Sequence, residues 1–300
     1  MPDVTVALAV DLGKSRCRAV LLDPERTVVH DGVGSPGLSA RGGVEAARAA
    51  ILPAIESLRS SPSVVSVGAA GAWAAPEAAA ELARELVAAT GTRAVVASDV
   101  VAAHAGALGG GEGVLLIAGT GAAALGIDAR GARLRDGWGP ELGDLGSGSW
   151  FGREALRAVL HASAGTGEDT ALTGLLRTTV GEPDGIPQWI SGDEPLARRL
   201  ASLAPLVLQA AESADAVASG IASEAVRLLT RSAVSASSHS GTVALHGGLT
   251  DHAWFRAELE TSLRRAGLAV APTLGDALDG ARLLAERTDL PHERFVHRAD

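Results

Sequence analysis

The stretch Val114-Leu115-Leu116-Ile117-Ala118-Gly119-Thr120-Gly121-Ala122 predicts a buried strand that ends in a glycine-flanked hydroxyl turn and leads into a second strand. A small-residue turn of this kind leaves backbone N–H groups free to bind a phosphate, with a hydroxyl beside them. Gly-Thr-Gly is also an ordinary hairpin turn, so one copy decides little. A comparable turn, Asp11-Leu12-Gly13-Lys14-Ser15, follows the apolar stretch 6–10. Two such turns in matching contexts predict two related halves that face one nucleotide.

The first half of the chain is predicted to form three strands followed by alternating helices and strands. The expected strands are 4–10, 18–23, 27–34, 64–69 and 94–97, with a turn at 23–26. The expected helices are 43–59, 76–90 and a segment from Ser98 or Asp99 to about 108.

The same order then restarts, with strands expected at 113–117, 123–128 and 132–135. The chain after Ser149 is predicted to be largely helical, apart from a Gly/Pro-rich stretch at 181–187. A late strand is expected at 242–245. Helices are expected at 252–265 and 274–287, on either side of a short strand at 268–270. This pattern predicts an α/β protein with two domains, 1–112 and 113–273, and a cleft between them. The helix 274–287 is a candidate to complete the first domain.

Composition excludes several classes of protein. Three hundred residues, 47% of them hydrophobic, are enough for a large core. No apolar run approaches the roughly 20 residues that span a bilayer, and the N-terminal sequence lacks the pattern of a secretion signal. The single cysteine, Cys17, excludes an intrachain disulfide framework, and a net charge of −9 argues against a nucleic-acid surface. We therefore expect a soluble, cytoplasmic protein with no membrane or nucleic-acid partner.

Three acidic or basic residues near the predicted strand ends could take part in chemistry. Asp11 could hold Mg²⁺, directly or through water, or could simply form the turn. Lys14 is the only lysine in the chain. A phosphate-binding role and chance explain its place in the first turn equally well. Asp99 could cap the helix that it opens or act as a general base; the segment alone favours the cap.

Glycines and tryptophans mark a second group of candidates. The loop 136–150 contains many glycines, two tryptophans and three carboxylates, a composition that suits neither a helix nor a regular strand. Within it Asp144 could bind sugar hydroxyls, while Trp138 stays undecided and Trp150 is interpreted as a packing residue. Gly247-Gly248 could approach a flat ligand or could form a tight strand-to-helix turn.

The histidines show no spacing typical of a metal site. His104 is interpreted as a surface or packing residue, and His292 and His297 as parts of a charged tail.

Together these stretches resemble the N-acetylglucosamine kinase branch of the BadF-type (BadF/BadG/BcrA/BcrD) ATPase family, within the sugar kinase/Hsp70/actin superfamily. The matching pieces are Asp11-Leu12-Gly13, Ser98-Asp99-Val100-Val101-Ala102-Ala103, Ala118-Gly119-Thr120-Gly121-Ala122, Gly137-Trp138-Gly139, Gly143-Asp144-Leu145-Gly146-Ser147 and Gly247-Gly248. Each piece is weak, whereas their order and spacing over nearly the whole chain are specific.

The resemblance implies two ribonuclease H-like (actin-like ATPase) domains with ATP and Mg²⁺ in the cleft. Asp99 matches the catalytic base, and Gly247 and Gly248 match positions beside the adenosine. The phosphate positions, with Asp11 also at the metal, are Asp11, Gly13, Lys14, Ser15, Gly119, Thr120 and Gly121. The positions that match sugar contacts are Thr120, Gly137 and Asp144.

Several positions depart from the family pattern. In the first turn Leu12 and Lys14 replace glycines and Ser15 replaces threonine. Ala122 and Ala123 stand where the family has Ser and often a sugar-binding Asn, which puts N-acetylglucosamine itself in doubt more than kinase chemistry. Asp136 replaces the first glycine of a usual pair with Gly137.

The sequence therefore predicts an ATP-dependent kinase of an amino sugar or related hexose. Its expected partner is a small-molecule sugar, and a homodimer stays open. A non-catalytic sugar sensor or degenerate kinase is the main alternative. An ATPase that activates an electron-transfer partner is disfavoured, because Cys17 has no companion to bridge a cluster.

Overall fold

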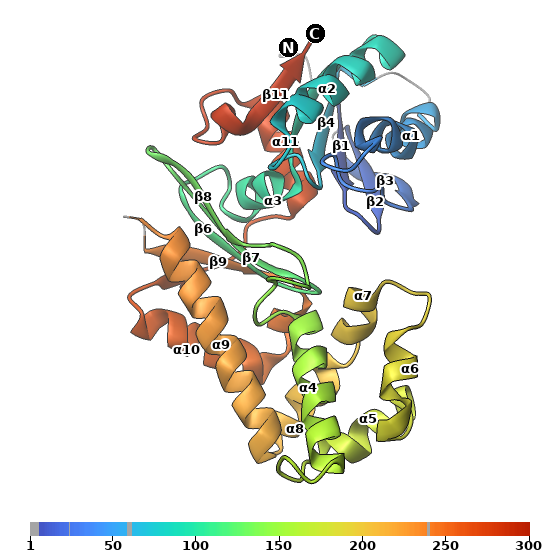
Figure 1. Ribbon diagram of the computed structural model, residues 1–300. Helices are drawn as coiled ribbons and strands as arrows, with labels where there is room; N and C mark the ends of the chain where they lie inside the picture. Colours follow the sequence, from blue (N-terminus) through green and yellow to red (C-terminus); the bar gives the residue numbers. More distant parts are fainter. Residues whose placement is uncertain (1–5, 24, 59–61, 239–240) are drawn as a thin grey trace. The chain divides into compact units, whose positions relative to one another are not determined.

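The computed structural model describes residues 6–23, 25–58, 62–238 and 241–300. Its contacts divide the chain into two compact units (Figure 1). Unit 1 holds the residues up to 112 together with 127–131 and 272–300, and unit 2 holds 113–126 and 132–271. In the described part of the chain no helix is both long and apolar enough to cross a bilayer.

Unit 1 is built on a sheet whose described strands follow the order β11-β5-β4-β1-β2-β3. These strands are β1 (Ala7–Leu12), β2 (Cys17–Asp23), β3 (Glu25–Gly32), β4 (Val64–Ala69), β5 (Arg93–Ser98) and β11 (Val296–Ala299). Its helices are α1 (Gly43–Glu56), α2 (Pro76–Thr90), α3 (Asp99–Ala107), α11 (Ala277–Glu286) and the short η3 (Glu293–Phe295). β1, β4 and β5 run parallel, while β2, β3 and β11 pair antiparallel with their neighbours.

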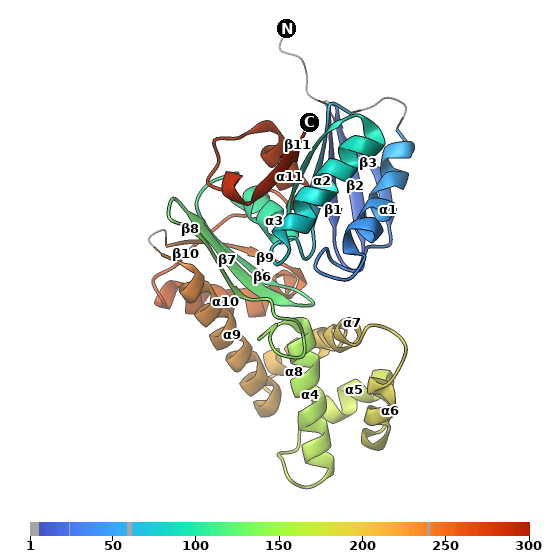
Figure 2. The ribbon, with the colours of Figure 1, turned by 45° about the horizontal axis from the view of Figure 1, so that its top comes forward.

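The helices of unit 1 cover both faces of its sheet (Figure 2). Alternate residues of β4 explain this arrangement, because successive side chains of a strand point to opposite faces. Val65 and Val67 join the apolar core beneath α1 and α2. On the other face the Ser66 hydroxyl donates to the Ala281 carbonyl of α11, and Gly68 lies against Ala102 of α3.

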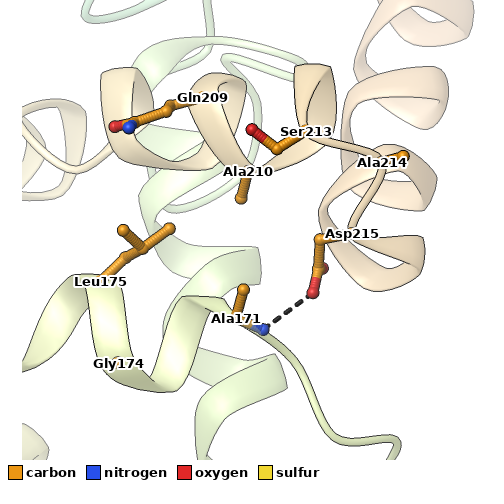
Figure 3. Close-up of a pocket in the computed structure, with 8 residues that line it drawn as sticks. All are labelled: Ala171, Gly174, Leu175, Gln209, Ala210, Ser213, Ala214 and Asp215. Carbon is orange, nitrogen blue, oxygen red and sulfur yellow. Dashed lines mark hydrogen bonds between the residues drawn. The ribbon is translucent and has the colours of Figure 1, made fainter.

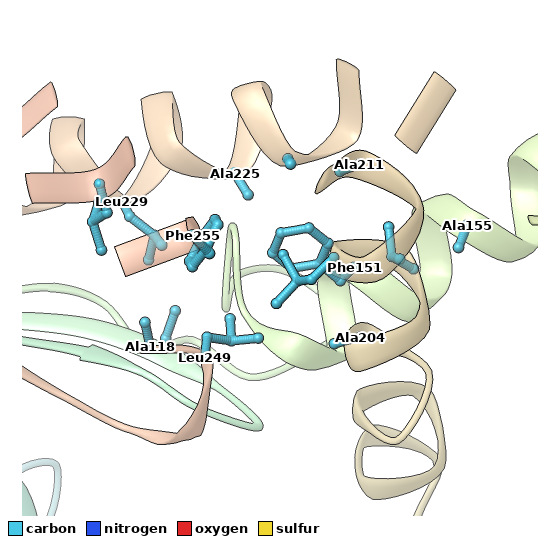
Figure 4. Packing of buried hydrophobic residues seen from close by; sticks show 14 of the residues in the cluster. Ala118, Phe151, Ala155, Ala204, Ala211, Ala225, Leu229, Leu249 and Phe255 are labelled. Atoms are coloured by element: carbon cyan, nitrogen blue, oxygen red, sulfur yellow. The ribbon is translucent and has the colours of Figure 1, made fainter. Parts of the chain in front are cut away.

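Unit 2 contains a sheet whose described strands follow the order β10-β9-β6-β7-β8. These strands are β6 (Gly113–Ala118), β7 (Ala122–Asp128), β8 (Gly131–Asp136), β9 (Thr242–His246) and β10 (Ala269–Ala271). The helices are α4 (Gly148–Ser163), α5 (Leu172–Val180), η1 (Pro183–Gly185), α6 (Ile186–Ile190), α7 (Leu196–Ala201), α8 (Ala204–Glu212), α9 (Ala216–Ala236), η2 (Gly248–Asp251) and α10 (Ala253–Arg265). Phe151 and Phe255 meet edge to face in its core, with ring centroids 5.5 Å apart (Figure 4).

The two sheets repeat one topology. In each unit the first strand lies between the second and the fourth, the third follows the second, and the fifth follows the fourth. β1 thus corresponds to β6, and the parallel pair β1–β4 corresponds to β6–β9. The duplication predicted from the sequence is confirmed, and with it the α/β fold class.

The C-terminal segment differs from its prediction. The interpretation of His292 and His297 as a charged tail is wrong, because His297 lies in β11, which pairs with β5. His292 is fully buried, and its Nε2 lies 2.8 Å from Nδ1 of the equally buried His104. A packing role for His104 is therefore confirmed, and a surface role is not.

The remaining element boundaries shift by a few residues. β1 ends at Leu12 and β3 at Gly32, whereas the sequence predicted 10 and 34. α1 ends at Glu56 instead of 59, and α11 begins at Ala277 instead of 274. Of the predicted turn at 23–26, residue 24 lies outside the described residues, as do residues 4 and 5 of the first predicted strand and residue 59 of the first helix.

Candidate active site

Asp11 and Asp99 lie at one edge of the unit 1 sheet. Asp11 is the penultimate residue of β1, and Asp99 follows directly on the last residue of β5. Both strands run parallel to β4, which lies between them, and Asp11 is level with Gly68 of β4. The carboxyl ends of parallel strands in an α/β sheet are the usual place for a ligand. The topology thus brings together two of the residues selected from the sequence.

The Asp99 carboxylate is not the cap of the helix that follows it. The N-cap position is held by Ser98, and Asp99 is the first residue of α3. Its Oδ1 accepts a hydrogen bond from the Ser98 hydroxyl at 2.9 Å and another from the Val100 N–H at 2.8 Å. Within the described part of the chain, no hydrogen bond involves Oδ2. The segment's preference for a cap is therefore wrong, and one carboxylate oxygen is left for another role.

Burial raises the pKa of Asp99 above its ordinary value. The hydrogen bonds from Ser98 and Val100 oppose this shift in the pKa, since they favour the charged carboxylate. The negative charge of Asp11 raises the pKa further, and the positive charge of Lys14 lowers it. Asp11, Lys14 and Asp99 are thus close enough to interact electrostatically, and a carboxylate with a raised pKa suits a general base.

Asp11 has a partner that sequence reasoning missed. Arg18 faces it in the antiparallel register of β1 and β2, and Arg18 Nη2 lies 3.2 Å from Asp11 Oδ2. The same guanidinium nitrogen is 3.9 Å from an oxygen of Asp276. The signal was present in the sequence, since the two residues flank a short turn at positions that an antiparallel pair places opposite each other.

The Asp11 carboxylate fits a magnesium ion that arrives with a nucleotide. Its side chain is 26% exposed, and its hydrogen bond uses only Oδ2. Among the described residues there is no group of three His, Cys, Asp or Glu that could hold a metal ion alone. Mg²⁺ commonly takes one or two protein carboxylates and completes its shell with substrate phosphates and water. A single carboxylate is enough for that mode of binding.

The first turn, residues 13–16, is closed by its own backbone. The Gly13 N–H donates to the Arg16 carbonyl at 2.9 Å, and the Gly13 carbonyl accepts from the Ser35 N–H at 3.2 Å. The side chains of Lys14 and Ser15 are exposed. Gly34 packs so closely on the turn that a Cβ there would lie 2.5 Å from the Arg16 nitrogen.

The second turn, residues 119–121, is the corresponding turn of unit 2. The Gly119 N–H donates to the Gly121 carbonyl at 3.0 Å. The first amides of α4 also bind the turn: the Gly148 N–H donates to the Gly119 carbonyl at 2.8 Å, and the Ser149 N–H to the Thr120 carbonyl at 3.1 Å. The turn is therefore fixed in place by the beginning of a helix.

Gly247 brings the loop after β9 against the second turn. β9 and β6 are parallel, so both loops leave the same edge of the sheet. A Cβ on Gly247 would lie 2.6 Å from the Ala118 carbonyl oxygen and 2.8 Å from the Gly119 nitrogen, and its φ of 106° is itself one that favours glycine. Gly248 begins η2 with open space beside it, since the nearest atom to a Cβ would be 4.0 Å away. Only glycine fits at 247.

The Asp144 carboxylate also contacts the second turn. Its Oδ1 accepts from the Ala122 N–H at 3.3 Å. A Cβ on Gly121 would lie 3.0–3.1 Å from the carboxylate atoms, so the absence of a side chain there makes room for Asp144. Gly137, with φ 75°, packs against the Ala123 side chain. Thr120, Gly137 and Asp144, the residues that match sugar-contacting positions of the family, thus lie together in unit 2.

Two large apolar side chains of the same loop are exposed: Trp138, whose role the sequence left undecided, and Leu142, which the sequence did not single out. Trp138 is 68% exposed and Leu142 81% exposed. Exposed large apolar side chains beside a polar group are typical of a ligand-binding surface. Trp150, in contrast, packs against the unit 2 core and meets Phe151 edge to face, as predicted.

A cavity of about 540 Å³ lies elsewhere in unit 2, between α5, α8 and the segment 213–215 that leads into α9 (Figure 3). None of the residues that line it was selected from the sequence. Its carboxylate, Asp215, accepts from the N–H groups of Ala171 and Ala218 and from the Thr170 hydroxyl. These bonds cap α9 and fix the start of α5, so the carboxylate of this cavity has a structural role.

Cys17 is buried in β2, and burial, with the nearby charges of Asp11 and Asp31, raises the pKa of its thiol to about 11. A thiol with that pKa is almost wholly protonated at neutral pH and is a poor metal ligand. This observation counts against the electron-transfer alternative.

Comparison with known proteins places these sites in context. The family model of the BadF/BadG/BcrA/BcrD ATPase family matches residues 8–278. An N-acetyl-D-glucosamine kinase of Dictyostelium discoideum is 34% identical over 134 residues, which are 43% of this chain and 42% of the relative. An N-acetylmuramic acid/N-acetylglucosamine kinase of Clostridium acetobutylicum is 33% identical over 138 residues, 45% of each chain. The matched segment thus spans less than half the length of these curated relatives.

The likeness to solved structures extends over nearly the whole chain. The structure of a candidate N-acetylglucosamine kinase from Chromobacterium violaceum superimposes with a TM-score of 0.71 at 27% identity. The superposition covers 94% of this chain and 99% of that one.

Proposed function

The chain belongs to the BadF/BadG/BcrA/BcrD ATPase family, and we propose that it is an ATP-dependent kinase that phosphorylates a hydroxyl of an amino sugar or related hexose. The observation that carries this proposal is the Asp99 carboxylate. It lies at the carboxyl edge of a sheet beside Asp11 and Lys14, has a pKa raised by burial, and keeps Oδ2 without a hydrogen bond in the described part of the chain. The names of the relatives, which are sugar kinases, support the same reaction.

In the proposed reaction Asp99 Oδ2 accepts the proton of the attacking sugar hydroxyl. The Ser98 hydroxyl and the Val100 N–H hold Oδ1, so the carboxylate is oriented before substrate binds. A positioned base of this kind typically contributes roughly 10²- to 10⁴-fold to the rate. The oxygen of the hydroxyl then attacks the γ-phosphorus of ATP, and the bond to the β-phosphate oxygen breaks, which releases ADP.

The phosphates are assigned to the two turns. The first turn contributes Gly13, Lys14 and Ser15, and the second contributes Gly119, Thr120 and Gly121. Mg²⁺, with Asp11 as its protein ligand, supplies charge neutralisation on the phosphates when bound. Lys14 adds a positive charge on an exposed side chain. The turn N–H groups add fixed dipoles, apart from those of Gly13 and Gly119, which bond within the turns.

The remaining assignments concern adenosine and sugar. Gly247 and Gly248 present bare backbone to the adenosine, and Asp144, Thr120 and Gly137 contact the sugar. Both turns must bind the same ATP for this mechanism to operate. A cytoplasmic location and a homodimer remain predictions.

The decisive experiment measures ADP release with Asp99→Asn and a panel of hexoses and amino sugars. We expect sugar-dependent ADP release by the wild type and a loss of roughly 10²- to 10⁴-fold in kcat for the variant. Asp289→Asn, which alters an exposed carboxylate that forms an ion pair with Arg287, is the matched control and keeps wild-type activity. Near-wild-type turnover by Asp99→Asn would show that the assigned base is wrong.

The pH profile adds an independent check. Asp99 must be ionised to accept a proton, and its pKa is raised, so activity falls as the pH drops through that higher value. The acid limb of kcat/KM is therefore expected above the ordinary aspartate range of about 4. Calorimetry tests the alternative that the protein is a sugar sensor. A sensor would bind sugar without binding ATP, whereas a kinase binds both.

A further inference from the structure

Asp136 occupies a position where the family usually has glycine, and the structure gives its side chain a distinct task. We propose that Asp136 is the positioning residue that holds Asp144 against the second turn for sugar binding. This inference rests on the proposed function, because it assumes that Asp144 contacts the sugar. It adds a residue that neither the sequence nor the family resemblance assigned.

The Asp136 carboxylate binds three backbone amides of the loop that follows β8. Its Oδ1 accepts from the Gly137 N–H at 2.8 Å and from the Asp144 N–H at 2.7 Å. Its Oδ2 accepts from the Leu145 N–H at 2.8 Å. One side chain thus ties the beginning of the loop to residues eight and nine positions later. Hydrogen bonds from amides to an ionised acceptor are shorter and stronger than neutral ones.

The backbone at both ends of this clamp adopts a conformation that needs support. Asp136 has φ 61° and Asp144 has φ 54°, the left-handed region that residues with a Cβ seldom occupy. Asp136 is only 6% exposed, so its carboxylate exchanges water for these three amides. Such a conformation persists where the surroundings determine it, and these residues cluster at ligand sites.

The clamp leads directly to the sugar-binding group. The amide of Asp144 is held by Asp136, while the Asp144 carboxylate reaches back to the Ala122 N–H and lies beside Gly121. Gly143 makes room for the arrangement, because a Cβ there would overlap Asp136 Oδ1 and lie 3.0 Å from the Trp138 Cβ. Asp136 therefore fixes the backbone from which Asp144 projects. A glycine at 136 would allow the same φ but would offer no acceptor.

The test is Asp136→Asn, which keeps the size of the side chain and the tolerance for positive φ. Whichever way the new amide is turned, its NH₂ group faces at least one backbone N–H, so the clamp loses an acceptor. Asp128→Asn is the matched control: Asp128 is also 6% exposed and its Oδ1 accepts from the Arg130 N–H at the other end of the β7–β8 hairpin. Asp136→Gly is the second variant, since glycine removes all three bonds without backbone strain.

The first readout is amide hydrogen exchange of the full chain without ligand. We expect the amides of Asp144 and Leu145 to exchange roughly tenfold faster in Asp136→Asn, and faster still in Asp136→Gly. The second is steady-state kinetics, in which the KM for sugar rises roughly tenfold while the KM for ATP stays unchanged. Asp128→Asn should leave both readouts for the loop as in the wild type.

The outcomes separate the clamp from the kinase assignment. Unchanged exchange at Asp144 and Leu145 in both variants overturns the clamp, whatever the activity. Faster exchange with an unchanged KM for sugar overturns the positioning role. A wild type that binds sugar in calorimetry but releases no ADP overturns only the proposed kinase reaction, and the affinity of Asp136→Asn for sugar then decides the positioning role. Absence of sugar binding by the wild type overturns both.

Discussion

Gly34→Ala is expected to disable the first turn while leaving the rest of unit 1 folded. Gly34 lies outside the turn, 18 residues after Arg16, and no motif singled it out. In the structure it lies directly against the backbone of residues 13–16. A Cβ at position 34 would overlap the Gly13 carbonyl oxygen and would lie 2.5 Å from the Arg16 nitrogen and 2.7 Å from the Lys14 carbonyl carbon.

The size of the effect follows from these contacts. Ordinary van der Waals contact begins at 3.4 Å, so the turn has to move by about 1 Å to accept the methyl group. Overpacking of this kind costs roughly 1–3 kcal/mol of unfolding free energy. A displacement of about 1 Å in a reacting geometry can lower the rate roughly a hundredfold, or about 2.7 kcal/mol of transition-state stabilisation.

The assay varies ATP at saturating sugar and follows ADP release, with urea denaturation in parallel. We expect kcat/KM for ATP to fall roughly a hundredfold, since the first turn binds phosphate in the proposed mechanism. Gly220→Ala in α9 is the matched control, because among the described residues no atom outside its own helix backbone and chain neighbours lies within 4 Å of a Cβ there. It should keep wild-type activity and gain about 0.5–1 kcal/mol of stability. Wild-type kcat/KM for ATP in a destabilised Gly34→Ala protein would refute the assignment of the turn.

Two further predictions use charges near the site and in the core. Lys14→Gly is expected to raise the KM for ATP several-fold in steady-state assays. It should also move the acid limb of the pH profile upward, because Lys14 lowers the pKa of Asp99; a lower KM for ATP would show instead that the lysine obstructs the turn. His292 has a pKa lowered to about 3 by burial and by the charge of His104, so the unfolded chain binds its proton first and stability falls as the pH drops below about 6.5. Between pH 6 and 4, His292→Gln should reduce the loss of unfolding free energy by up to about 1.4 kcal/mol per pH unit. The measurement is urea denaturation of both proteins at several pH values. An equal dependence of the unfolding free energy on pH in the two proteins would contradict this account.

Local patterns in the sequence predicted most of the fold. Apolar runs located β4, and Pro76 with Gly91 located both ends of α2, because strand burial and helix boundaries depend on neighbouring residues. β11 was missed for the opposite reason. Its four residues include His297 and Arg298, and the segment becomes a strand only by pairing with β5, some two hundred residues earlier.

The residues of the candidate site could be selected from the sequence where a turn or a strand end has a recognisable motif. Asp11, Asp99, Thr120 and Asp144 each follow or lie within a glycine-rich or strand-end motif, so residue type and position selected them. Gly34 has no such local signal. Arg18 is marked in the sequence only by its position across a short turn from Asp11, and Asp136 only as a departure from the family pattern. Their roles come from strand register, from close approach of distant backbone, and from a left-handed φ with three amide bonds.

Each of the two turns proposed to bind phosphate is shaped by a glycine from outside the turn. Gly34 packs on the first turn, and Gly247 on the second, so closely that a methyl group at either position would meet turn backbone. Turns held this way keep their N–H groups in place before a ligand arrives, and such preorganisation is what makes fixed dipoles effective towards phosphate charge. The departures from the family pattern at Lys14 and Ser15 therefore change side chains on a turn whose backbone is constrained from outside, while the departure at Leu12 lies at the end of β1. The exposed side chain of Lys14 agrees with this view. Because neighbouring residues hold the backbone of the turn, a lysine can stand in place of a glycine without changing the shape of the turn.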